Sequence, residues 1–137
     1  MHIIRDGRDV ILSHLVRCGY QKAIWATKTW RRSITSARDF AKNVPQDQYY
    51  EFRYEDLVEN PEDTLEKLFQ YLGEPWNSAL LEEGSFDIEI SARRRIESGE
   101  TSVIYKSRVG VGQKKLDPFL GALFYYRSGH LMKELGY

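Results

Sequence analysis

The first eighteen residues constrain the fold of this chain more than any other stretch. Residues 2–4 predict a short buried strand, and the polar turn after them leads into a helix. Asp6 can cap that helix by accepting hydrogen bonds from backbone N–H groups, and Gly19 is placed to end it. The side chains expected on the buried face of the helix are Ile11, Leu12, Leu15 and Val16. A strand, a turn and a helix in this order indicate an α/β fold.

Three polar side chains around this turn are of the kinds that hold a phosphate group. Arg5 stands at the end of the strand, while Ser13 and Arg17, four residues apart, share one face of the helix. Two guanidinium groups, a hydroxyl and the positive end of a helix dipole can together bind a dianionic phosphate. The alternative is a solvated helix start with local ion pairs, because short Arg-Asp runs also occur there.

The bulk composition limits the class of protein. A length of 137 residues predicts a single domain, and 42% hydrophobic with 29% charged residues is typical of a globular protein. The net charge of zero argues against a general nucleic-acid-binding protein. The single cysteine, Cys18, excludes an internal disulfide and favours a reducing compartment. With no signal peptide, no apolar run of membrane-spanning length and no metal-ligand spacing, we expect a cytoplasmic protein without membrane attachment or a bound metal.

A second strand is predicted beside the first. The spacing of apolar residues in 21–43 predicts a long basic helix. The alternation of side chains in residues 49–55 predicts a strand. A strand, helices and a strand in this order predict a right-handed crossover and a parallel pair. Ligands of such sheets bind at the carboxyl ends of the strands, so Arg5 and Tyr54 are expected to face one crevice.

The second half of the chain contains two helices with clear boundaries. One is predicted from Asn60-Pro61 to Gly73, and the other from Asp117-Pro118 to about Glu134. Residues 84–115 between them lack periodicity, which predicts a long irregular stretch. Within it, residues 107–112 could offer backbone N–H groups to an anion, with an ordinary surface loop as the alternative.

Four stretches follow one another along the chain in a recognisable order. They are residues 4–13, the basic helix with its tryptophans, residues 52–61 with the sequence Tyr-Glu-Asp-Leu, and residues 72–76. Together they resemble the sulfotransferases that use 3′-phosphoadenosine 5′-phosphosulfate (PAPS). The similarity is to the bacterial sulfotransferase-like group, and also to tyrosylprotein sulfotransferases. The resemblance implies the C-terminal part of a P-loop NTPase-like fold, with parallel strands flanked by helices.

The resemblance also implies roles for individual residues. Arg5 and Ser13 match the pair that holds the 3′-phosphate of the nucleotide, and Arg17 matches a further basic contact of the tyrosylprotein branch. Tyr54 matches the tyrosine beside the adenine. The residues that match the late loop closing on the 3′-phosphate are Ser107, Arg108 and Gly110.

In the family, two further parts of the site precede the 3′-phosphate motif. A Pro-x-Ser-Gly-Thr-like loop cradles the 5′-phosphosulfate, and a His or a carboxylate activates the acceptor. Neither precedes Arg5 here, so residues 1–137 are expected to form one partial sulfotransferase domain with no identified catalytic residue. It would bind PAPS or its product PAP and belong to an enzyme that transfers a sulfuryl group to a hydroxyl or amine. By itself it would show little or no turnover.

The expected partners follow from the same resemblance. The acceptor would be a small molecule, a glycan or a peptide, and no nucleic acid is expected. A partial domain would leave a strand edge exposed, which predicts a homo-oligomer or a strand-exchanged dimer. Two alternatives stay open at this point. One is a non-catalytic nucleotide-binding or assembly module, and the other is a nucleotide-kinase-like P-loop relative that uses ATP and Mg²⁺.

Overall fold

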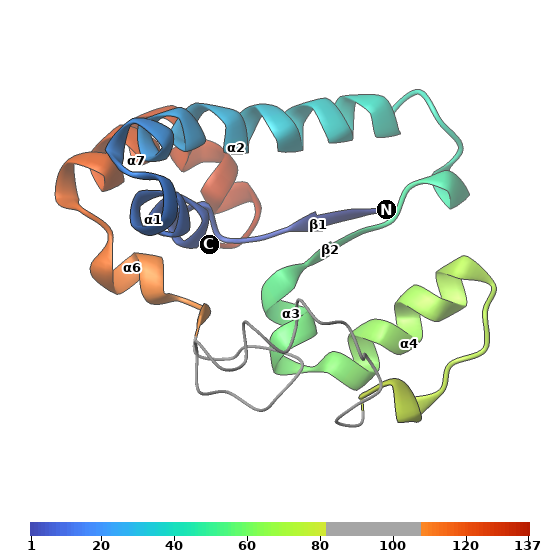
Figure 1. Ribbon diagram of the computed structural model, residues 1–137. Coiled ribbons are helices and arrows are strands. Elements are labelled where there is room, and N and C mark those ends of the chain that lie inside the picture. Colours follow the sequence, from blue (N-terminus) through green and yellow to red (C-terminus); the bar gives the residue numbers. More distant parts are fainter. Residues whose placement is uncertain (82–107) are drawn as a thin grey trace. The chain divides into compact units, whose positions relative to one another are not determined.

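The computed structural model describes residues 1–81 and 108–137 (Figure 1). The first unit comprises residues 1–55 and 108–137, and the second begins at residue 56 and is described to residue 81. The elements are β1 (His2–Ile4), α1 (Gly7–Cys18), α2 (Tyr20–Ala41), a 3₁₀ turn (Gln46–Gln48), β2 (Glu51–Arg53), α3 (Tyr54–Glu59), α4 (Pro61–Leu72), a second 3₁₀ turn (Ser78–Leu81), α6 (Val111–Lys115) and α7 (Pro118–Glu134).

The two strands of the first unit run parallel. Ile3 is in register with Phe52, and His2 and Ile4 are in register with Glu51 and Arg53. The predicted parallel pair and the α/β class are therefore confirmed. The second strand is shorter than the expected 49–55, because Tyr54 already begins α3. Both strands end where Arg5 and Tyr54 follow them.

The helix after β1 begins and ends where the sequence predicts. Oδ1 of Asp6 accepts a hydrogen bond of 2.8 Å from the backbone N–H of Arg8 and so caps α1. Gly19 has a φ of 80°, a conformation that favours glycine, and its N–H donates to the carbonyl of Leu15 at 3.1 Å. The next helix, α2, starts immediately afterwards at Tyr20. Together these caps fix the path of the chain away from the end of β1.

The core of the first unit lies among α1, α2 and α7, and Figure 1 shows α2 running alongside β1 while α1 and α7 lie together at one end of α2. Trp30 of α2 meets the ring of Phe124 of α7 edge-on, with 5.2 Å between the ring centroids. Ile11 of α1 is fully buried, whereas Val16 is 78% exposed. The expected burial of Val16 was wrong, because five residues of helix place it about 140° around α1 from Ile11.

The second unit begins within α3 and contains α4. Asn60 precedes the helix, Pro61 is its first residue, and Gly73 ends it with a φ of 73°. These are the predicted boundaries. The hydroxyl of Thr64 donates to the carbonyl of Asp56 at 3.0 Å, which ties the start of α4 to α3.

The chain is described again from residue 108, and α6 follows at Val111–Lys115. These five residues were expected to be irregular, and that expectation was wrong. A helix of little more than one turn is too short to show an apolar period, and tertiary contacts must hold it in place. The final helix, α7, matches the prediction, and Oδ1 of Asp117 accepts from the N–H of Leu120 at 3.1 Å. The other residues of the expected irregular stretch, 84–107, lie outside the described residues.

Candidate functional site

The carboxyl ends of the two strands bring Arg5 and Tyr54 together. The Cζ atom of Arg5 lies 4.5 Å from the centre of the Tyr54 ring, a cation–π contact. The indole N–H of Trp30 donates to the carbonyl oxygen of Arg5 at 2.9 Å, so the backbone at this point is fixed as well. The predicted convergence of Arg5 and Tyr54 is therefore confirmed.

The Arg5 guanidinium is held on one side and keeps a donor unused. Its Nη2 donates to the backbone carbonyl of Arg108 at 2.5 Å and lies 3.5 Å from Oδ2 of Asp9. Its Nε is buried and has no hydrogen-bond partner within the part of the chain that the structure describes. A buried N–H of a charged group is costly to leave unpaired, so this donor is well suited to an anionic ligand.

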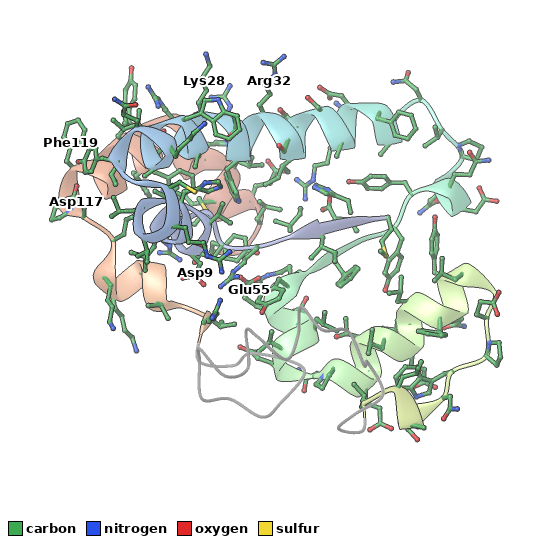
Figure 2. All side chains as sticks on the ribbon, viewed as in Figure 1. Asp9, Lys28, Arg32, Glu55, Asp117 and Phe119 are labelled. Atoms are coloured by element: carbon green, nitrogen blue, oxygen red, sulfur yellow. The ribbon has the colours of Figure 1, made fainter. Side chains whose placement is uncertain are left out.

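Asp9 occupies the N–H groups that were expected to meet an external anion. Its Oδ2 accepts from the backbone N–H of Gly110 at 2.9 Å, and its Oδ1 accepts from that of Gly112 at 2.5 Å. The residue is only 4% exposed. Figure 2 shows Asp9 on α1, the helix against which α6 packs. The glycine-rich segment thus binds a carboxylate of the chain itself.

Ser13 and Arg17 lie further along α1 than Arg5. Ser13 is half-buried, and Arg17 is exposed in the last turn. At 1.5 Å per residue, Arg17 is about 15 Å from the start of the helix, so it does not lie beside the N-terminus. Within residues 1–81 and 108–137, neither side chain makes a hydrogen bond or an ion pair. Ser107 lies outside the described residues.

Glu55 joins the two strand ends and was not singled out from the sequence. Its Oε1 accepts from the backbone N–H of Asp6 at 2.9 Å, and its Oε2 accepts from the hydroxyl of Tyr137 at 2.8 Å. Burial and the hydrogen bond to this carboxylate raise the pKa of Tyr137 well above its ordinary value. The position of Glu55 directly after Tyr54 was the available signal.

Asp6 and Arg8 form a second charged pair beside the turn. Nη2 of Arg8 lies 2.7 Å from Oδ2 of Asp6, and this hydrogen bond raises the pKa of Arg8 despite partial burial. Asp6 is therefore used twice, as the cap of α1 and as the partner of Arg8. Arg8 is committed to Asp6, whereas Arg5 keeps an unused donor.

An open cavity of about 310 Å³ lies against β1 and the facing sides of α1 and α2. Arg5 lines it together with His14, Trp25 and Trp30. The Nδ1 atom of His14 is buried and unpaired within the described residues, and the His14 ring meets Trp25 edge-on at 6.4 Å. The cavity is therefore lined by aromatic rings and by the Arg5 side chain next to the strand end.

Residues 1–81 and 108–137 contain no cluster of three metal-ligating side chains. No helix in those ranges has the length and apolar character needed to cross a membrane.

Comparison with known proteins points to one family. Residues 1–78 match the sulfotransferase family. A protein-tyrosine sulfotransferase of Drosophila melanogaster is 26% identical over 92 residues, which are 63% of this chain and 18% of that protein.

Two solved structures share the fold. The sulfotransferase domain of the Synechococcus PCC 7002 olefin synthase matches with a TM-score of 0.69 and 22% identity, over 90% of this chain and 47% of that one. The sulfotransferase domain of the curacin biosynthetic pathway matches with a TM-score of 0.71 and 18% identity, over 94% and 51% of the two chains. The chain thus spans about half the length of these domains and has their P-loop-like α/β fold. It belongs to the sulfotransferase family.

Proposed function

We propose that this chain supplies the nucleotide-binding part of a PAPS-dependent sulfotransferase and that Arg5 binds the 3′-phosphate of PAPS or PAP. The observation that carries the proposal is the buried, unpaired Nε of Arg5, on a guanidinium braced over Tyr54. This group lies in the strand–turn–helix stretch within the matched residues 1–78. A charge-assisted hydrogen bond from arginine to phosphate is among the stronger polar contacts in proteins.

The other residues of the proposed site either contact the nucleotide or support Arg5. Tyr54 offers a ring at the strand end, next to which the adenine of the nucleotide would lie. Ser13 contributes a hydroxyl from α1, and Arg17 adds positive charge further along the same helix. Arg108 contributes its backbone carbonyl to the support of Arg5. Because Gly110 donates its N–H to Asp9, we assign it to that support as well.

The proposed reaction is the transfer of a sulfuryl group to an acceptor hydroxyl or amine. PAPS supplies the sulfuryl group and leaves as PAP. The residues of this chain bind and orient the nucleotide, which is the positioning part of catalysis. The groups that stabilise the leaving phosphate and take up the acceptor proton are not assigned to this chain, so we expect binding with little or no turnover. The acceptor belongs to the small-molecule, glycan or peptide class.

Thermal denaturation with added nucleotide tests the proposal. We expect PAP to raise the melting temperature of the protein, and Arg5→Ala to weaken PAP binding about 10- to 100-fold, because one charged hydrogen-bond donor is lost. Ser13→Ala should weaken binding less, since a neutral hydroxyl is the weaker donor. Arg32→Ala is the matched control, because Arg32 is exposed on the outer face of α2 (Figure 2).

Three results would speak against this assignment. A PAP effect that survives Arg5→Ala would remove the phosphate site from this position. A larger shift with Mg²⁺-ATP than with PAP would favour a nucleotide-kinase-like protein. No shift with either nucleotide would favour an assembly module that does not bind nucleotides.

A further inference from the structure

Asp9 is a buried carboxylate whose partners come from two distant parts of the chain, the end of β1 and the segment that begins α6. Its side chain is 1% exposed. Two of its contacts are backbone N–H groups of the segment before and within α6, from Gly110 and Gly112, and the third is the Arg5 guanidinium. A carboxylate is costly to bury unless it is paired and hydrogen-bonded. Asp9 meets that requirement only while α6 stays against α1.

The backbone of the later segment is shaped for this contact. A Cβ atom at position 112 would overlap the backbone of Arg8 and Asp9, so only glycine allows the approach. Gly110, with a φ of 71°, adopts a conformation that side chains disfavour. Two glycines therefore bring two N–H groups to one carboxylate. This is a second observation, independent of the hydrogen bonds, that the contact is specific.

The same segment also holds Arg5. The carbonyl of Arg108 accepts from Nη2 of Arg5, and Oδ2 of Asp9 lies near the same nitrogen. Arg5 is thus fixed at Nη2, while its buried Nε has no hydrogen-bond partner among the described residues. Rigid support of this kind keeps a binding group in its productive geometry.

We propose that Asp9 is a positioning residue that locks Arg5 and the 108–112 backbone into one 3′-phosphate site. This inference rests on the proposed nucleotide function. Asp9 itself does not contact the phosphate. It keeps the segment on α1, and the segment keeps the Arg5 guanidinium in place over Tyr54.

The direction in which phosphate affinity changes when Asp9 is replaced distinguishes a positioning role from a simple electrostatic one. A negative charge beside Arg5 repels a phosphate, so loss of that charge alone should strengthen phosphate binding. If Asp9 instead fixes the geometry, its loss should weaken binding. Asp9→Asn is nearly isosteric, but it removes the charge and turns one acceptor oxygen into an N–H₂ donor that faces a backbone N–H.

Calorimetric titration with two nucleotides distinguishes these cases. We expect Asp9→Asn to weaken the binding of PAP about tenfold, while adenosine 5′-phosphate, which lacks the 3′-phosphate, binds as to the original protein. Asp39→Asn is the matched control, because Asp39 is exposed on α2 and pairs only with Lys42 among the described residues. Gly112→Ala leaves Asp9 intact but prevents the approach, and it should reproduce the selective loss of PAP binding.

Amide hydrogen exchange without nucleotide tests the contact separately from the proposed function. The N–H groups of Gly110 and Gly112 should exchange slowly in the original protein and faster in Asp9→Asn. Tighter PAP binding by Asp9→Asn, an equal loss for both nucleotides, or unchanged exchange would each overturn the positioning role. If the original protein does not prefer PAP to adenosine 5′-phosphate, the proposed function fails, and the exchange rates still decide whether Asp9 holds the segment.

Discussion

At the scale of single residues, Tyr49 makes the stability of the first unit depend on alkaline pH. Its hydroxyl donates to Oε2 of Glu51 at 2.7 Å. Burial and this hydrogen bond raise the pKa of Tyr49 to about 12. Glu51 also binds Arg38 and His2, and although burial opposes it, these hydrogen bonds lower the pKa of Glu51. Tyr49 therefore sits in a charged cluster that favours its protonated form.

The raised pKa of Tyr49 should make the folded protein less stable as the pH rises. Between about pH 10 and pH 12 the unfolded chain loses the Tyr49 proton while the folded chain keeps it, so the free energy of unfolding falls as the pH rises. Tyr49→Phe removes both the hydrogen bond, about 1 kcal/mol near neutral pH, and this dependence. Urea unfolding should show the difference between the two proteins narrowing from about pH 8 to about pH 11.

A matched substitution separates this effect from general alkaline unfolding. Tyr126 is 89% exposed on α7, so Tyr126→Phe should parallel the original protein at every pH. A difference between the original protein and Tyr49→Phe that stays constant or grows with pH would show that the Tyr49 hydroxyl is not the source of this pH dependence.

At the scale of elements, α6 is held by its contact with α1 rather than by its own sequence. Gly112→Ala places a methyl group where the backbone of Arg8 and Asp9 lies, so α6 should leave α1. Lys114 and Lys115 are exposed in this helix and offer cleavage points for trypsin. We expect cleavage after these two residues to be several-fold faster in Gly112→Ala than in the original protein, as followed by mass spectrometry.

Gly121 provides the control for that experiment. It lies inside α7, and the nearest atom to a Cβ added there is Cδ2 of Leu116, at 4.0 Å. Gly121→Ala should therefore stabilise the protein by about 0.5 kcal/mol through helix propensity and leave the cleavage rate at α6 unchanged. Equal cleavage rates in Gly112→Ala and Gly121→Ala would show that the contact does not hold α6.

The contrast between α7 and α6 shows what the sequence could predict. The ends of α1, α4 and α7 followed from local signals: capping residues, prolines at the first position and glycines at the end. The meeting of Arg5 and Tyr54 followed from the parallel order of the strands. The partners of Asp9 lie 101 and 103 residues away, in a segment too short to show a period. Only the folded chain reveals that the glycines serve a carboxylate.

Spacing also has limits within one helix. It placed Ser13 and Arg17 on a common face of α1, but the rise of about 1.5 Å per residue also puts Arg17 too far along the helix to lie beside its N-terminus. Glu55 lies within the Tyr-Glu-Asp-Leu stretch of the family resemblance, but its role was missed because that role depends on Tyr137 at the other end of the sequence. The hydrogen-bond partners of a buried carboxylate next to a site residue therefore decide its role.

At the scale of the whole molecule, the outer edge of β1 is the feature that bears on assembly. In the described residues β1 pairs only with β2, so its other edge has no strand partner there, and Ile3 within β1 is 46% exposed. An uncovered strand edge is a template for pairing with another chain. A second copy offers the same edge, and a two-fold arrangement would pair the two β1 strands antiparallel. We therefore expect this protein to self-associate through β1.

Light scattering over a range of micromolar concentrations measures this self-association directly. The original protein should move from monomer to dimer as its concentration rises, and its melting temperature should rise with it, because association stabilises the folded state. Ile3→Lys places a charge in this edge strand and should keep the protein monomeric. Val16→Lys is the control: Val16 is also exposed, but it lies on α1 away from the strand edge, so this variant should dimerise as the original does. A monomer at every concentration, or dimers that persist in Ile3→Lys, would rule out pairing through β1.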